Sequence, residues 1–374
     1  MKNKQFVILE AIAIILIVAG HKGGIPFLHI NDFFSLYGYH VALFIFISGY
    51  FFKIENTQHI PLFIWNKTKK LLIPYFGWNI IYACIASILQ HRHTTSYFEV
   101  LTNIFSFQKL FIQPWTDGHQ YYLNLATWFV TILFLTQVIY TLLQKYTNKW
   151  FNSEWLQILL LVIGLISVYI SNSISPIPNY LKPILKVSFF LPFYHFGYYY
   201  RTKLETKAST IPNTWFFLLL FLIQYDLYSR FGAPDYYLGQ CNYKQNLFIP
   251  FISSFVGILF WLRISRILVP LLGNNKYVHY IGNNTWSIMV HHLFVFFLIN
   301  LGLKHIRLDT FNNFLFRTDF WYSCPSVPYW LYVGLGIILP IIWQQWFNIG
   351  KNKGLLTIQI AKSKILKQEK RRNR

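Results

Sequence analysis

Long apolar segments recur along the whole chain, and each ends at charged residues or at a break rich in Pro and Asn. A bilayer core needs about 20 mostly apolar residues per helix, and about 17 are tolerated. By this measure the pattern predicts an all-α, polytopic membrane helix bundle with about ten transmembrane helices. The predicted spans are 5–21, 35–52, 71–90, 124–143, 155–171, 184–200, 214–228, 247–262, 281–301 and 329–347.

The distribution of basic residues gives this bundle an orientation. With the N-terminus inside, 23 of the 33 Lys and Arg residues fall on the cytoplasmic side of a ten-span bundle. Cytoplasmic loops of membrane proteins carry such an excess, so both termini are expected in the cytoplasm. We expect one membrane domain over 1–349 and a basic cytoplasmic tail over 350–374 that is attracted to anionic lipid.

Composition supports the membrane class. Of the 374 residues, 55% are apolar and only 12% are charged, with a net charge of +21, whereas about 25% of a soluble domain is charged. Nucleic-acid binding would need a basic face on a soluble domain, so membrane lipid is the expected partner and nucleic acid is not. The three cysteines have no CxxC spacing or nearby ligand cluster, so we expect no metal site. Cys241 and Cys324 both fall in predicted outer loops, where an oxidising compartment allows them to pair.

Ionisable residues inside spans are costly, and each is therefore a candidate for function. Glu10 and His21 are eleven residues apart in the first span, close to three full turns, so they share one helix face about 16 Å apart. His40 begins the second span and is expected beside His21 at the outer leaflet. The alternative is that His21 only ends the first span at the membrane interface.

Three lysines, Lys67, Lys69 and Lys70, cluster on the cytoplasmic side of the third span. This cluster is able to hold phosphate groups, although positive-inside anchoring explains such clusters equally simply. Ser48 and Gly49 allow a close approach of helices in the inner half of the second span. Packing and a binding role both remain open for Ser48.

The ninth span carries two adjacent histidines, His291 and His292, with Ser287 one turn before His291. Two mid-membrane histidines are difficult to explain by packing alone. Aromatic and polar residues of a long outer loop suit a sugar ligand but also an ordinary interfacial belt. These loop residues are Trp115, Asp117, His119, Tyr121 and Tyr122.

In this order and spacing the motifs resemble the integral-membrane acyltransferase 3 family, with closest similarity to its fucose 4-O-acetylase-like branch. The resemblance covers nearly the whole chain. The segments that carry it are 18–21 (VAGH), 44–50 (FIFISGY), the basic run before 72–75 (LIPY), 127–130 (TWFV), 193–198 (FYHFGY), 281–287 (IGNNTWS) and 291–292 (HH).

The resemblance implies a catalytic role for His21 and contact of the acyl-CoA donor with Lys67, Lys69 and Lys70. Two departures from the family pattern stand out. Glu10 lies in the stretch where many relatives carry Arg. The basic run has Lys where many relatives have Arg, and a lysine binds phosphate as a point charge without the bidentate geometry of arginine. His40 and Ser48 join the catalytic and cofactor-binding candidates, and the candidate substrate-binding residues are Trp128, His291 and His292.

The resulting hypothesis is a membrane O-acyltransferase in the cell membrane, most simply a bacterial cytoplasmic membrane. It would move an acetyl group from cytosolic acetyl-CoA to a hydroxyl of a sugar in a surface polysaccharide or its lipid-linked precursor. His21 would act as general base, and direct transfer and an acyl-histidine intermediate are both compatible with the sequence. The alternative is a carrier or flippase for a lipid-linked glycan, which has no need of CoA. The sequence does not indicate an oligomeric state.

Overall fold

The computed structural model describes residues 3–22, 33–91, 105–244, 246–305, 324 and 327–349. Within these ranges the regular structure is helical, apart from one isolated β-bridge between Tyr237 and Asn242. The all-α membrane bundle predicted from the sequence is thereby confirmed. The predicted basic tail, 350–374, lies outside the described residues.

The described helices follow one another along the chain, and several of them continue directly into a 3₁₀ or π-helical turn. The helices are α1 (Lys4–Gly20), α3 (His40–Tyr50), α4 (Ile60–Lys67), α5 (Ile73–His91), α6 (Trp128–Thr147), α7 (Ser153–Ser173), α8 (Lys182–Tyr199), α9 (Glu205–Thr210), α10 (Asn213–Phe231), α11 (Ile249–Ile267), α12 (Val269–Leu272), α13 (Lys276–Asn283) and α14 (Thr285–His305). A final helix covers Tyr329–Ile349. Short 3₁₀ turns include η1 (Leu36–Gly38), η7 (Tyr122–Thr127) and η9 (Leu238–Gln240), and π-helical turns include η3 (Thr68–Leu72) and η8 (Tyr200–Leu204).

Each predicted span overlaps a helix, but their lengths differ from the prediction. Six described helices are long and apolar enough to cross a membrane, or seven if the bent pair Lys182–Thr210 and Asn213–Phe231 is one span. That pair is bent by 112°, and hydropathy along a sequence cannot reveal such a bend. The second predicted span includes turn η1, so its helix α3 has only 11 residues.

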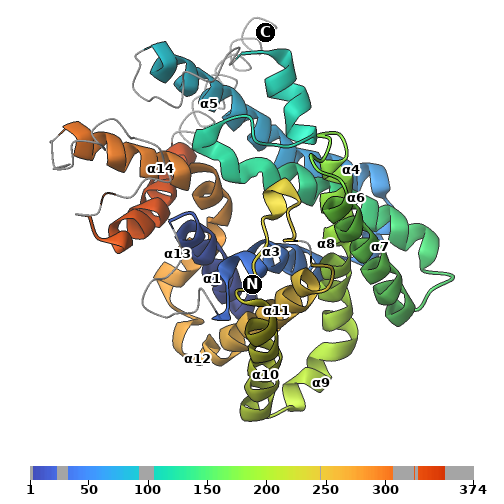
Figure 1. Ribbon diagram of the computed structural model, residues 1–374. Helices are drawn as coiled ribbons and strands as arrows, with labels where there is room; N and C mark the ends of the chain where they lie inside the picture. Colours follow the sequence, from blue (N-terminus) through green and yellow to red (C-terminus); the bar gives the residue numbers. More distant parts are fainter. Residues whose placement is uncertain are drawn as a thin grey trace, which may run out of the picture.

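Helix α1 lies in the middle of the bundle. Most of its 17 residues are buried, on every side of the helix, as expected for a helix that is apolar all round. It packs against α3, α11, α13 and α14, and Figure 1 shows these helices around it. Because protein surrounds α1, the polar residues on it face other helices.

The helix starts follow local rules. Asn3, Asn152 and Asn275 cap α1, α7 and α13, each accepting a hydrogen bond from a backbone N–H of the first turn. Helices α4, α8, α11 and α12 begin with a proline in the first turn, where the missing N–H leaves no hydrogen bond unmade. These signals are readable in the sequence.

Helices α3 and α8 approach each other through glycine. A Cβ atom added to Gly49 would lie 1.8 Å from the backbone oxygen of Tyr194, and one added to Gly197 would lie 2.2 Å from that of Phe46. Backbones this close leave no room for a side chain. The close approach predicted at Ser48 and Gly49 is confirmed.

We therefore expect Gly49→Ala to destabilise the protein by about 2 kcal/mol or more, because the added methyl group meets backbone atoms that cannot move aside. In a helix without neighbours the same change is stabilising by roughly 0.5–1 kcal/mol. Gly77→Ala on α5 is the control, since a Cβ there meets nothing within 4 Å. Melting of the purified protein in detergent measures both variants, and equal melting temperatures for the two would contradict the packing argument.

Candidate functional site

Two adjacent cavities lie along α1. We call the first the lysine pocket; its volume is about 400 Å³ and its walls come mainly from α1, α3, α4, η3, α6, α8 and α14. Its charged and polar lining includes Glu10, Ser48, Asn56, Lys67, Lys70 and Gln137. Two ammonium groups at one cavity favour an anionic ligand such as a phosphate.

The three predicted lysines do not all reach this pocket. Lys67 and Lys70 line it, whereas Lys69 lies outside its lining and extends over the exposed ring of Trp65, with Nζ 5.4 Å from the centroid. All three lie at or next to the π-helical turn η3, a wide turn of a kind often found at functional sites. Ser48 does line the pocket, where its hydroxyl accepts a 2.7 Å hydrogen bond from Gln137.

We call the second cavity the histidine pocket; its volume is about 320 Å³. Three imidazoles line it, those of His21, His40 and His119. Its aromatic lining consists of Tyr37, Phe44, Trp128, Phe129, Tyr236 and Tyr237. The pocket thus combines titratable nitrogens with extended apolar surfaces, which is typical of sites for small molecules.

One face of α1 runs through both pockets. Glu10 and Ile14 line the lysine pocket, and Ile17 and His21 line the histidine pocket. Residues spaced by three and four positions share a helix face, so the predicted common face of Glu10 and His21 is confirmed.

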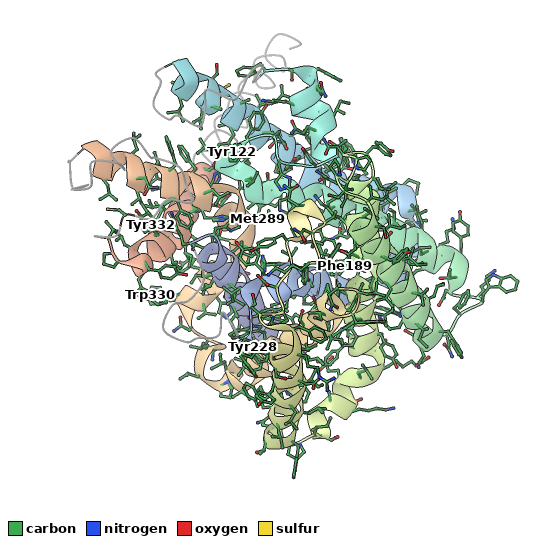
Figure 2. The ribbon with its side chains drawn as sticks, viewed as in Figure 1. Tyr122, Phe189, Tyr228, Met289, Trp330 and Tyr332 are labelled. Carbon is green, nitrogen blue, oxygen red and sulfur yellow. The ribbon has the colours of Figure 1, made fainter. Side chains whose placement is uncertain are left out.

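The two pockets share a wall. Phe44, Phe129 and Met289 line both cavities, and the rings of Phe44 and Phe129 lie 6.3 Å apart. Figure 2 shows Met289 near the middle of the bundle. These three side chains therefore form a boundary that the two pockets share.

Hydrogen bonds to the helix backbone set the tautomers of three histidines. Nδ1 of His21 lies 2.9 Å from the carbonyl oxygen of Ile17, four residues earlier. His40 makes the same contact to Leu36, and His292 makes it to Ile288. Because a carbonyl only accepts, each Nδ1 carries the proton and each Nε2 keeps its lone pair.

His292 lies directly behind His21. Its Nε2 is 3.3 Å from Nδ1 of His21, and the ring centroids are 5.0 Å apart. The Nδ1–H of His21 is therefore shared between Ile17 and His292, as in a three-centre bond. Nε2 of His21 therefore keeps its lone pair and is available as a base. Ile17 and His292 hold the orientation of this imidazole, and His21 lines the histidine pocket.

Lys22 follows His21 in the chain and contacts a different set of residues. Its Nζ lies 4.7 Å from the ring centroid of Phe296 and 4.3 Å from that of Tyr332. Burial lowers the pKa of Lys22 to about 7. Where this ammonium group is charged, it disfavours a second positive charge on the neighbouring imidazole.

The predicted residue His291, and His195 of the 193–198 segment, lie elsewhere. His291 hydrogen-bonds Tyr82 at 2.8 Å and packs edge-on against Trp78; it lines a separate, mostly apolar cavity between α5, α14 and the final helix. His195 is held by Tyr140 and by the backbone of Ser153. Neither residue lines the lysine pocket or the histidine pocket.

The predicted residue Trp128 is at the histidine pocket, in a stack of three side chains. Its ring lies parallel to that of His119, and Nζ of Lys186 is 4.6 Å from its centroid. Lys186, near the start of the predicted span 184–200, is buried within α8. Burial and the nearby charge of Lys186 lower the pKa of His119 to about 4, so its imidazole is neutral near pH 7.

Sequence reasoning missed three features of this site. It did not place the turn Leu238–Gln240 in the histidine pocket, because a loop of this kind carries no periodic signal. It did not find the wall of Phe44, Phe129 and Met289, which are ordinary apolar residues in their helices. It grouped His292 with His291, although their adjacent positions put them on different faces of α14.

The possible pairing of Cys241 with Cys324 is not observed, and both side chains are buried. Cys241 packs near the start of α8, where its thiol is 3.8 Å from the backbone oxygen of Lys182. The backbone N–H of Cys324 donates to Tyr332 on the final helix. The two cysteines thus contact different helices.

A family model described as an acyltransferase domain, that of the acyltransferase 3 family, matches residues 4–349. No curated protein matches the chain, and no solved structure does.

Proposed function

Because the chain belongs to the acyltransferase 3 family, whose members are multi-pass membrane acyltransferases that act on carbohydrates, we propose that it is an O-acetyltransferase using acetyl-CoA. The acceptor we propose is a hydroxyl of a sugar in a surface polysaccharide or in its lipid-linked precursor. The proposed location is a bacterial cytoplasmic membrane, and the proposed branch of the family is the fucose 4-O-acetylase-like one.

The observation that carries this proposal is the pair of pockets with a shared wall. A phosphate-bearing donor suits Lys67 and Lys70, and a base suits a separate pocket where an acceptor hydroxyl binds. The thioester would then meet the hydroxyl at the shared wall of Phe44, Phe129 and Met289. A carrier for glycans would not need a phosphate-binding pocket beside a separate pocket that contains a base.

The chemistry follows from the tautomer of His21. The acceptor hydroxyl attacks the thioester carbonyl while its proton moves to Nε2 of His21, so that the C–O bond forms as the C–S bond breaks. The proton then passes to the leaving CoA thiolate. His292 stabilises the transient imidazolium, because its Nε2 accepts from the Nδ1–H of His21.

Removing the base tests the catalytic assignment. We expect His21→Ala to lower the rate of acetyl transfer by about 10²–10⁴-fold, the usual contribution of a general base. Insertion into the membrane and accumulation should be normal. The measurement is thiol release from acetyl-CoA by purified protein, and transfer retained by this variant would remove His21 from the mechanism.

The lysines test the donor site. We expect Lys67→Gln and Lys70→Gln each to raise the Kd for acetyl-CoA about tenfold, since a charge-assisted hydrogen bond contributes about 1.5–3 kcal/mol. Lys69→Gln should change the Kd less than twofold, because Lys69 lies outside the pocket lining. Titration calorimetry measures the three variants, and equal losses for all three would favour diffuse electrostatic attraction over this site.

Variants of the adjacent residues His292 and His291 test whether His292 positions His21. We expect His292→Ala to lower kcat about tenfold to a hundredfold without changing either KM, because the residue acts through His21. His292→Gln, whose side-chain oxygen can accept the same hydrogen bond, should restore part of kcat. His291→Ala should leave kcat within about threefold, and a loss equal to that of His292→Ala would contradict the positioning role.

A further inference from the structure

The histidine pocket has a lining without formal charge. Among the described residues that line it there is no Asp, Glu, Lys or Arg, in contrast to the lysine pocket with Glu10, Lys67 and Lys70. Its polar groups are imidazoles, tyrosine hydroxyls and the amide of Gln240, which donate or accept hydrogen bonds while neutral. Lys186 lies over the ring of Trp128 but is not part of the lining, so a charged ligand placed here would lose its hydration without a charged side chain in direct contact.

The size of the cavity limits the ligand. At about 320 Å³ it is at the small end of the roughly 300–1,000 Å³ typical of small-molecule sites. Its aromatic lining residues come from η1, α3, α6 and the α10–α11 connection. One sugar ring, with apolar faces and a rim of hydroxyls, matches this combination better than an extended chain.

One wall is a rigid hairpin between α10 and α11. Tyr237 and Asn242 exchange two backbone hydrogen bonds, of 2.8 and 3.1 Å, and enclose the turn Leu238–Gln240. The pair formed by Lys244 and Asp235 closes the base of the hairpin. This part of the pocket is therefore held in one shape.

At the tip of the hairpin, Gly239 lies against the opposite wall. A Cβ atom added there would be 3.1 Å from Nε2 of His119 and 3.6 Å from Nε1 of Trp128. Gly239 does not have positive φ, so the backbone accepts other residues. The absence of a side chain at Gly239 lets the hairpin tip approach His119 and Trp128 closely, and a larger residue there would press on both of these pocket side chains.

We propose that the acceptor group bound in the histidine pocket is a single uncharged pyranose ring, and that Gly239 of this hairpin, facing His119 and Trp128, determines which rings fit. The proposal rests on the proposed function, because it names the substrate class of the same site. It goes further in excluding uronic acids and in assigning specificity to a loop that no sequence motif marks.

The test uses the full chain in lipid nanodiscs with acetyl-CoA and pairs of methyl glycosides. Methyl glucoside is paired with methyl glucuronide, and methyl galactoside with methyl galacturonide, so that each pair differs only at carbon 6; methyl fucoside and methyl N-acetylglucosaminide complete the neutral set. Two measurements run in parallel: the shift in melting temperature on adding sugar, and the release of CoA thiol.

We expect at least one neutral glycoside to raise the melting temperature and to accelerate thiol release, with its uronide at least tenfold weaker where a pair exists. Gly239→Val should lower kcat/KM for that glycoside at least tenfold, while the Kd for acetyl-CoA stays within twofold. Gly302→Val is the matched control, since a Cβ at Gly302 meets nothing within 4 Å. Gly239→Ala is the second variant if Gly239→Val does not fold, and we expect it to lower kcat/KM about threefold or more.

The outcomes separate the two proposals. Thiol release that depends on His21 but is insensitive to Gly239 and to the charge of the sugar would overturn the inference and leave the proposed function standing. Sugar binding that depends on Gly239 without any thiol release would overturn the proposed function and support the pocket assignment. If no neutral glycoside binds, a single-ring acceptor is excluded.

Discussion

The hydrogen bond that His21 shares with Ile17 and His292 is the interaction on which the rest of the site depends. It joins the end of α1 to α14, two helices far apart in the chain, and it fixes which nitrogen of His21 carries the proton. An imidazole in a dry bundle would otherwise be free to rotate or to change tautomer. The surrounding apolar packing makes the arrangement stable, because a buried polar group without a partner is costly.

The second constraint is the separation of charge along α1. Glu10 and the two lysines meet at one cavity, and neutral imidazoles line the next. Phe44, Phe129 and Met289 keep the two environments apart while leaving them within the reach of one flexible ligand. In the mechanism we propose, the charged donor binds in the lysine pocket, the neutral acceptor binds in the histidine pocket, and the reaction occurs at the boundary between them.

The central position of α1 and α3 explains why short helices are sufficient here. Helix α3 has 11 residues, fewer than the roughly 17 needed to cross a bilayer alone. Its buried residues face α1, α8 and α11, so protein rather than lipid surrounds it on those sides. Both pockets are lined in part by α1 and α3.

The sequence by itself determined the membrane class, the positions of the helices and the candidates His21, His40, Lys67 and Lys70. Hydropathy, caps and charge are local properties, and each residue carries them wherever it lies in the fold. The tertiary structure alone decided which candidates meet: it placed His292 behind His21, turned His291 and Lys69 away from the pockets, and brought Gly239 against His119. Those contacts join segments far apart in the chain, and they depend on helix rotation and on the bend between α8 and α10, which no periodic pattern specifies.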